Sequence, residues 1–273
     1  MAATLEPARA YDTLAFAYDA LTADYCHEEW VPALESLAQA HGLRGRRLLD
    51  VACGTGKSFL PLLERGYAVT GCDASGEMLA RAAAKAPAAR LLQADMRRLP
   101  PLGRFDLVTC LDDALNYLVS MSDLVAALRG IAGSLDDRGL AVWDLNTLGM
   151  YRGAFAGDWL TEVDGLFVAW EGETPADLAG GGLAHATVHV FSRADGESWQ
   201  RTTSRHRQRH WRAEDVRRAA AQAGLAVLAT HGQRRGGVIQ SWLDELEHTK
   251  SVYVACRADA RREGGERMAI GGP

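Results

Sequence analysis

The chain has 273 residues, enough for one large α/β domain, or for such a domain with a modest insertion, to bury a core without disulfides or metals. Thirty Lys and Arg against 35 Asp and Glu give a formal net charge of −5. A charge of this sign provides no general field that attracts a phosphate backbone, so a nucleic-acid partner is disfavoured.

The cysteines and the hydropathy pattern bear on the compartment. The five cysteines are an odd number, are widely spaced and mostly lie inside apolar runs, as is typical of small buried side chains in a reducing compartment. No charged-then-apolar leader opens the sequence, and no run approaches the roughly 18 apolar residues that span a bilayer. We expect a cytoplasmic protein without a membrane partner.

The first 45 residues predict helices that lie against the rest of the domain, because apolar residues recur at helical spacing from Tyr11 to Ala40. Tyr11, Tyr18 and Tyr25 fall seven residues apart, which places three aromatic rings near one face. The commoner outcome for such spacing is a stripe packed in the core. The alternative is a lid whose rings cover a ligand.

Residues 46–146 alternate strand and helix patterns with short connections. The expected strands span residues 48–51, 68–72, 91–94, 105–111 and 140–145, with helices at 58–65, 75–85 and 124–135. A helix at 213–223 and strands at 225–230 and 251–256 complete the pattern within residues 212–257. This order predicts a doubly wound α/β fold around a mostly parallel sheet of seven strands.

The alternation stops at residues 147–211, which predict an inserted antiparallel β-element on the substrate side. Three expected strands, at 166–170, 183–192 and 198–211, are joined by Gly-rich turns. An exposed edge of this sheet could pair with a second chain, so a homodimer is one expectation. The tail at 258–273 is polar, Gly-rich and aperiodic, and we expect it to be disordered.

A glycine turn follows the first expected strand of the core. Gly54-Thr55-Gly56 links a buried strand to a helix, so its backbone can approach a ligand closely while the helix N-terminus offers unpaired N–H groups. A P-loop would need glycine where Val51 stands, so the following Lys-Ser match is accidental. A dinucleotide site would want a small residue where Phe59 stands, which weakens that interpretation.

Two acids end the next two strands. Asp73 follows Gly54 by 19 residues, the position from which a carboxylate can accept hydrogen bonds from both hydroxyls of a ribose. Asp95 ends the third strand and, with Met96, could bind an adenine amine and a ring nitrogen. The alternative for Asp95 is a cap of the turn that follows it.

In combination these motifs resemble the class I S-adenosylmethionine-dependent methyltransferases, in a bacterial branch that includes many small-molecule enzymes. The resemblance covers roughly residues 11–256 in order. It rests on DVACGTG at 50–56, GCDAS at 71–75 with Met78 and Leu79, QADM at 93–96, FDLVTC at 105–110, ALNYL at 114–118, YDTLA at 11–15 with Tyr18, Asp19 and Trp30, and RQR at 207–209.

The resemblance implies S-adenosylmethionine as the cofactor. The glycine turn would hold the methionine moiety, Asp73 the ribose and Asp95 with Met96 the adenine, while Leu111 would lie beside the methyl group. Tyr11, Tyr18 and Trp30 would form the lid. Lys57 departs from the small or apolar residue usual after the turn, and its role stays open. The full implied set is Tyr11, Tyr18, Trp30, Gly54, Gly56, Asp73, Ala74, Met78, Asp95, Met96 and Leu111.

Methyl transfer is an in-line displacement, so the enzyme mainly aligns the nucleophile and excludes water. A general base is needed only for a hydroxyl, a carbon acid or a protonated amine. The candidate catalytic residues are Asp112, Asn116 and Tyr117, beside Asp113 after the fourth strand, and His210 in the inserted element, which also supplies His189, His206, Trp170 and Trp211. The alternative for these histidines is an exposed polar strand face. No His or Cys pair has metal-ligand spacing, so no metal is expected.

The sequence therefore predicts an enzyme that moves a methyl group to an N or O atom of a small-molecule acceptor. Its Ala, Arg and Gly richness suggests bacterial specialised metabolism. Four alternatives remain open at this stage: a C-methyltransferase, a tRNA or protein methyltransferase, a non-catalytic protein that binds adenosine ligands, and an NAD-dependent oxidoreductase.

Overall fold

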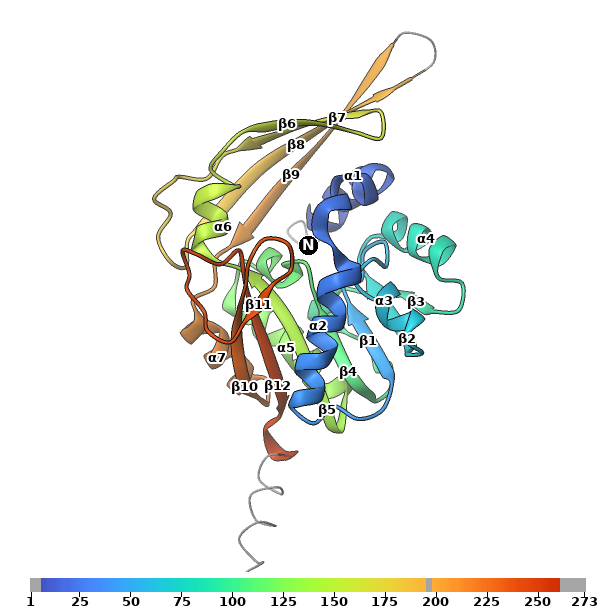
Figure 1. Cartoon of the computed structure of the whole chain (residues 1–273), viewed down its shortest axis with the longest axis vertical. Coiled ribbons are helices and arrows are strands. Elements are labelled where there is room, and N and C mark those ends of the chain that lie inside the picture. The colour runs from blue at the N-terminus through green and yellow to red at the C-terminus, as the bar shows by residue number, and fades with distance from the viewer. Residues whose placement is uncertain (1–5, 195–197, 261–273) are drawn as a thin grey trace, which may run out of the picture.

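The computed structural model describes residues 6–194 and 198–260. It contains an eight-stranded sheet and a separate four-stranded sheet, with the first helix, α1 (Glu6–Leu21), between them (Figure 1). The expected lid region forms α1, a short 3-10 turn η2 (Ala23–Tyr25) and α2 (His27–Ala40), so the helices predicted from the apolar spacing are confirmed.

The larger sheet has the order β11-β10-β12-β5-β4-β1-β2-β3. Strands β1 to β5 are parallel, and β12 and β10 add antiparallel strands next to β5. The strands are β1 (Arg47–Val51), β2 (Ala68–Asp73), β3 (Arg90–Gln93), β4 (Phe105–Cys110), β5 (Leu135–Asn146), β10 (Leu225–Gln233), β11 (Ile239–Gln240) and β12 (Lys250–Arg257). The doubly wound, mostly parallel sheet is confirmed. Its eighth strand, the two-residue β11, was too short to predict.

Helices cover both faces of this sheet. Side chains of α5 (Met121–Ser134) and α7 (Ala213–Gln222) share one hydrophobic cluster with Leu49 and Val51. Side chains of α2, α3 (Leu60–Glu64) and α4 (Gly76–Lys85) share the other cluster with Leu48. Because neighbouring residues of β1 enter different clusters, the strand is buried on both faces, as a central parallel strand must be.

Local side-chain caps fix where several helices start. Ser75 accepts a hydrogen bond from the Met78 N–H at the start of α4, and Ser120 accepts one from the Asp123 N–H at the start of α5. Such caps satisfy N–H groups that have no partner inside the helix. Since α4 follows β2 and α5 follows β4, the caps hold the loops at the carboxyl ends of these strands.

The second sheet corresponds to the predicted insertion, with more structure than expected. It consists of β6 (Trp159–Val163), β7 (Leu166–Gly172), β8 (Leu183–Arg193) and β9 (Trp199–Arg209), preceded by the short helix α6 (Leu148–Gly153). Helix α6 and strand β6 were not predicted. Strand β6 pairs with β7 through a tight turn in which Asp164 and Gly165 have positive φ, and its mostly exposed residues give no alternating hydropathy signal.

The C-terminal end of the described chain lies away from the second sheet (Figure 1). In the predicted tail, Ala258, Asp259 and Ala260 are helical rather than irregular, and the Ala258 N–H donates to the Gly224 carbonyl. The prediction of disorder for residues 261–273 lies outside the described residues.

Candidate active site

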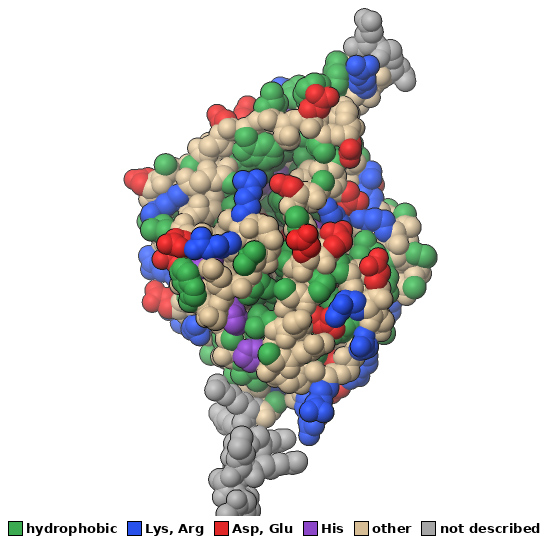
Figure 2. Space-filling model, viewed as in Figure 1, with side chains coloured by type: hydrophobic (Ala, Val, Ile, Leu, Met, Phe, Trp, Pro, Cys, Tyr) green, Lys and Arg blue, Asp and Glu red, His purple; other side chains and the backbone are tan. Residues whose placement is uncertain are grey.

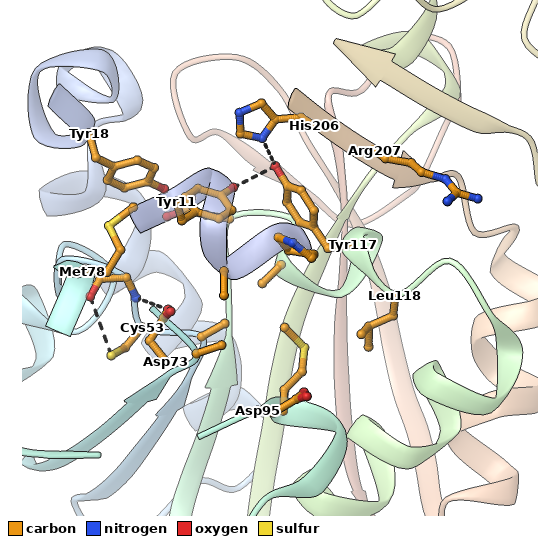
Figure 3. A pocket seen from close by; sticks show the side chains of 18 of the residues that line it. Tyr11, Tyr18, Cys53, Asp73, Met78, Asp95, Tyr117, Leu118, His206 and Arg207 are labelled. Carbon is orange, nitrogen blue, oxygen red and sulfur yellow. Dashed lines mark hydrogen bonds between the residues drawn. The ribbon is translucent and has the colours of Figure 1, made fainter. Parts of the chain in front are cut away.

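A cavity of about 390 Å³ lies at the carboxyl ends of β1 to β4, where strand order reverses between β1 and β4 (Figure 3). Ligands bind at such a switch point in open α/β sheets. Eleven predicted site residues line the cavity: Tyr11, Tyr18, Gly54, Asp73, Ala74, Met78, Asp95, Met96, Leu111, Asp112 and Tyr117. The lining does not include Trp30, Gly56, Asn116 or His210.

The floor of the cavity is the glycine turn together with Asp73. Gly54 has a φ of +53°, and a Cβ built there would meet no atom within 4 Å, so there is open space over the turn. The Asp73 carboxylate accepts hydrogen bonds of 2.8 Å from the Gly54 N–H and the Ser75 N–H. Burial raises the pKa of Asp73, and the two N–H donors oppose that rise. An oriented carboxylate beside open space fits a ligand that carries a ribose.

Gly56 serves packing rather than ligand contact. It has a φ of +89°, and a Cβ there would lie 2.7 Å from the Phe59 ring. Phe59 is fully buried beneath the turn. The bulky residue that weakened the dinucleotide interpretation therefore fills the space below the loop.

Asp95 lines the adenine end of the predicted site, but it also has a partner inside the chain. Its carboxylate accepts from the Arg97 backbone N–H and Nε at 2.9 Å, and from Nη2 at 2.6 Å. Burial alone would raise the pKa of Asp95, but the bonds from Arg97 outweigh it and lower the pKa. The capping alternative is thus observed, at the start of the 3-10 turn η3 (Met96–Arg98). Arg97 also lines the cavity and was missed, since a basic residue in a short loop carries no distinct sequence signal.

The predicted aromatic lid is only partly assembled. Tyr11 and Tyr18 face the cavity, with ring centroids 5.8 Å apart in an edge-to-face arrangement. Tyr25 instead lies near His27 and is 42% exposed. Trp30 is 2% exposed and packs in the core below, so it is not part of the lid surface.

Helix α1 is fastened to the cavity floor by polar contacts. Asp12 accepts a hydrogen bond of 2.5 Å from the Ser75 hydroxyl, and Asp19 accepts one of 2.5 Å from the Thr55 hydroxyl. Lys57 donates to the Thr22 carbonyl at 2.6 Å, just past the end of α1, and to the Asp19 carbonyl at 3.4 Å. The ammonium group of Lys57 thus caps the C-terminus of α1, and Lys57 also lines the cavity.

A buried charge cluster shapes the loop after β4. Asp112 and Asp113 both have positive φ, 57° and 53°, and their backbone N–H groups donate to the Asp144 carboxylate. Lys250 pairs with Asp113 at 2.9 Å and with Asp144 at 3.2 Å, while His27 Nε2 lies 2.8 Å from Asp112 Oδ2. These partners hold a left-handed pair that side chains rarely adopt.

One carboxylate oxygen of Asp112 lies beside a charged group without a hydrogen bond. Oδ1 is buried and, among the described residues, has no hydrogen-bond partner, although Lys250 Nζ is 3.9 Å away. Burial would raise the pKa of Asp112, but the contacts with His27 and Lys250 lower it, so the carboxylate is ionised at neutral pH. Because Asp112 lines the cavity and its side chain is partly exposed, this carboxylate can accept a hydrogen bond from a ligand that donates N–H or O–H.

Two predicted catalytic residues have structural partners instead. Asn116 donates to the Arg209 carbonyl at 2.8 Å and accepts from the Asn146 N–H at 3.0 Å. His210 Nδ1 accepts from the Gly181 N–H, and its Nε2 lies 3.0 Å from Glu245. Both side chains are buried and tie the second sheet to the core rather than facing the cavity.

The second sheet forms the roof of the cavity. Of the histidine and tryptophan candidates on that sheet and just after it, only His206 lines the cavity, where its Nδ1 lies 2.7 Å from the Tyr117 hydroxyl. Tyr117 in turn accepts a hydrogen bond of 2.9 Å from the Tyr11 hydroxyl. Further polar residues of the roof are Glu173, His185, Thr187, Arg205 and Arg207. Figure 3 shows Arg207 pointing away from His206.

Other features of the described chain bear on the remaining expectations. On the face drawn in Figure 2, Lys and Arg side chains are scattered among Asp and Glu rather than gathered in one patch. No disulfide joins any of the five cysteines, all of which lie within the described ranges. Within residues 6–194 and 198–260, no three His, Cys, Asp or Glu side chains form a metal-binding group. None of the helices in these ranges combines the length and the hydropathy that crossing a bilayer requires.

Comparison with known proteins gives one family. Residues 48–139 match the family described as a methyltransferase domain. The chain is 30% identical over 227 residues, 80% of its length, to a protein of Geobacillus sp. (strain WCH70) provisionally named a methyltransferase, and the match covers 90% of that protein.

Two further likenesses agree. The chain is 36% identical to the dTDP-3-amino-3,6-dideoxy-α-D-glucopyranose N,N-dimethyltransferase of Streptomyces fradiae over 109 residues. This match covers 40% of the chain and 43% of that relative. Its fold matches the crystal structure of an S-adenosylmethionine-dependent methyltransferase from Clostridium acetobutylicum with a TM-score of 0.76 and 24% identity, over 90% of this chain and 98% of that one. With the glycine turn, Asp73 and the strand order in place, the chain belongs to the class I S-adenosylmethionine-dependent methyltransferases.

Proposed function

We propose that the protein methylates the nitrogen of a small-molecule amine with S-adenosylmethionine as methyl donor. The observation that carries this proposal is the ionised carboxylate of Asp112 in the lining of the cavity that also holds the glycine turn and Asp73. A buried carboxylate oxygen binds an amine N–H or an ammonium group better than an ether or a carbonyl, which cannot donate.

The chain's residues then have separate tasks. S-adenosylmethionine, when bound, supplies a methyl group on a positively charged sulfur. Gly54, Asp73 and Asp95 would hold that ligand, as the resemblance implies, while Asp112 would hold the acceptor nitrogen close by. As the N–C bond forms and the S–C bond breaks, S-adenosylhomocysteine would leave, and the Asp112 carboxylate would accept the proton that the methylated nitrogen loses. Tyr11 and Tyr18 exclude water above the reacting atoms. Alignment and exclusion of water supply most of the rate enhancement, so no nucleophilic side chain is required.

The comparisons support an amine acceptor. The relative from Streptomyces fradiae is named for N,N-dimethylation of an amino sugar nucleotide. Methylation of oxygen is the second candidate, because a hydroxyl also donates to Asp112. Carbon methylation is less favoured, because a C–H group makes no such hydrogen bond. The mixed charge of Figure 2 gives no support to a tRNA acceptor.

A mass-spectrometric screen tests this function. The purified protein is incubated with S-adenosylmethionine and either dTDP-3-amino-3,6-dideoxyglucose, glycine or sarcosine, with the 3-hydroxy counterpart of the sugar nucleotide as a matched control. We expect a methylated product from at least one amine and none from the hydroxyl compound. Methylation of the hydroxyl compound alone would contradict an amine acceptor and favour methylation of oxygen. Binding of S-adenosylhomocysteine without methylation of any amine in a broad panel would also contradict the proposal.

Three finer points belong to the same proposal. Bacterial specialised metabolism and a cytoplasmic location rest on composition and on the relatives. A homodimer is supported by the free edges of the second sheet, since β6 and β9 each pair with one strand only, and by Leu160 on β6, which is 69% exposed. The molar mass measured by light scattering decides between monomer and dimer.

A further inference from the structure

Three rings from three distant segments form one hydrogen-bonded chain in the roof of the cavity (Figure 3). Tyr11 comes from α1, Tyr117 from the 3-10 turn η4 (Ala114–Tyr117), and His206 from β9. Tyr11 Oη donates to Tyr117 Oη at 2.9 Å, which lies 2.7 Å from His206 Nδ1. At the far end, His206 Nε2 lies 2.5 Å from the buried Ser204 hydroxyl on the same face of β9.

One order of donors accounts for all these contacts. When Tyr11 donates its proton to Tyr117, the proton of Tyr117 can be donated to His206 Nδ1. A neutral imidazole that accepts at Nδ1 carries its proton on Nε2, where the Ser204 oxygen accepts it. All three protons therefore point from α1 toward β9, and the Tyr11 oxygen keeps only lone pairs for the cavity.

The surroundings of His206 keep its ring neutral. The residue is 6% exposed, its ring stacks near Trp170 with centroids 6.4 Å apart, and the edges of Tyr11 and Tyr117 lie close. In the described part of the chain, the ring has no hydrogen bond to a carboxylate. The charge of Asp113 acts on both tyrosines, and Glu173 of the roof accepts a hydrogen bond from Thr187 on β8. Burial lowers the pKa of His206 to about 4.

We propose that His206 is a positioning residue that fixes the polarity of this chain, so that Tyr11 presents a pure hydrogen-bond acceptor to the amine. This rests on the proposed function. If the proton were on Nδ1, Tyr117 would donate to Tyr11, and Tyr11 would offer its own proton to the nitrogen lone pair that must attack the methyl group. One tautomer thus decides whether the lone pair is free or blocked.

An effect on the number of methyl groups follows. A primary amine and its monomethyl product, once neutral, each keep an N–H that can donate to the Tyr11 oxygen. A neutral dimethylamine has none, so it loses this contact. A third transfer should therefore be slower than the first two by roughly two- to tenfold, the effect of one neutral hydrogen bond.

The tautomer is tested directly by nitrogen NMR of protein labelled with 15N-histidine, saturated with S-adenosylhomocysteine, with the His206→Asn spectrum to assign the signal. We expect His206 to be neutral with its proton on Nε2 at all pH values above about 5, as a pKa near 4 requires. A proton on Nδ1, or titration near the ordinary histidine pKa, overturns the proposal even if no acceptor has been found.

The positioning role is tested with the amine found in the screen. His206→Asn keeps an oxygen acceptor near the Nδ1 position and should retain most of kcat/KM for the amine. His206→Leu should lower kcat/KM by roughly two- to tenfold, the effect of one neutral hydrogen bond, with the Kd for S-adenosylhomocysteine unchanged. Equal activity of the two variants overturns the proposal. Absence of transfer by the unsubstituted protein counts against the proposed function, while the NMR result still decides the tautomer.

Discussion

Asp50 has a buried carboxyl group and lies on β1, just before the glycine turn. Its two oxygens accept hydrogen bonds from the Ser58 hydroxyl at 2.5 Å and the Thr109 hydroxyl at 2.6 Å. Burial raises the pKa of Asp50 to about 7, and the two hydroxyl donors only partly oppose that rise. The group is therefore half protonated near neutral pH, in a position where charge and loop geometry are coupled.

The substitution Asp50→Asn should make the protein relatively more stable as pH rises. Because the folded pKa of Asp50 lies above the unfolded value, the native state binds more protons between about pH 4 and pH 7, and its stability falls across that window. The asparagine variant lacks this loss. We therefore expect the difference in free energy of unfolding, variant minus unsubstituted protein, to increase by up to about 1.4 kcal/mol per pH unit across this window.

Urea unfolding near pH 5 and near pH 8 measures this difference. An unchanged difference between the two pH values would show that Asp50 is ionised throughout.

At the scale of single residues, sequence reasoning located the ligand-facing backbone but not side-chain partnerships. Gly54 and Asp73 were predictable because a turn between strand and helix, and an acid at a strand end, have spacing signatures. The cap that Lys57 places on α1 was not, since it joins residues 35 apart through tertiary packing. Trp30 and His210 look the same in sequence whether they face a cavity or the core.

Helix α1 carries the lid tyrosines and connects them to the glycine turn. It contacts Thr55 and Lys57 at the turn and Ser75 at the start of α4. Each of these three residues lies within three residues of Gly54 or Asp73, the predicted ligand contacts. Its apolar side, with Leu14 and Ala17, packs against the second sheet. One helix thus contacts both the floor and the roof.

Removing the cap on α1 should loosen the lid. Lys57→Met deletes donors to the carbonyls that end the helix, and charge-assisted hydrogen bonds of this kind contribute about 1.5 to 3 kcal/mol. We expect faster amide hydrogen exchange along α1 and roughly tenfold faster dissociation of S-adenosylhomocysteine.

The matched control is Lys85→Met. Lys85 pairs with Asp19 on the same helix, but both side chains are partly exposed, 30% and 43%, and surface pairs contribute about 0 to 1 kcal/mol. Equal effects of the two substitutions would mean that charge near α1, rather than the cap, holds the helix.

The elements of the core were predictable, and those of the insertion only in part. Strands β1 to β5 are short apolar runs between helix signals, so their order gives the parallel sheet. Strand β6 has exposed residues and is held by pairing with β7, so nothing in its own sequence marks it. The same holds for β11, whose two residues depend on β10.

The whole molecule encloses its cavity between segments far apart in the chain. Tyr11, Asp73 and His206 face one space although nearly 200 residues separate the first from the last. A ligand that fills this space therefore contacts both sheets and α1, and its binding should stabilise the fold as a unit.

S-adenosylhomocysteine should raise the melting temperature, and NAD should not. At a ligand concentration about 100 times Kd the gain is about 2.7 kcal/mol, or roughly 5 to 10 °C for a chain of this size. Asp73→Ala, which removes the carboxylate expected to hold the ribose, should weaken binding by well over tenfold and abolish most of the shift.

Scanning calorimetry with each ligand gives the shift, and titration calorimetry gives the Kd. Since Asp73 also holds the Gly54 N–H, circular dichroism of the variant confirms that it is folded. Full retention of the shift by Asp73→Ala would remove the ribose assignment.

The roof sheet has its own hydrophobic contacts, with Val168, Val188 and Val190 packed against α1, separate from the clusters that hold the floor. The polar roof residues, such as Arg205 and Thr187, lie on strands that contribute nothing to the glycine turn. We therefore expect exchange of roof side chains alone to change the range of acceptors, while affinity for the methyl donor is preserved. Directed evolution of new substrates should accordingly concentrate its libraries on β8 and β9.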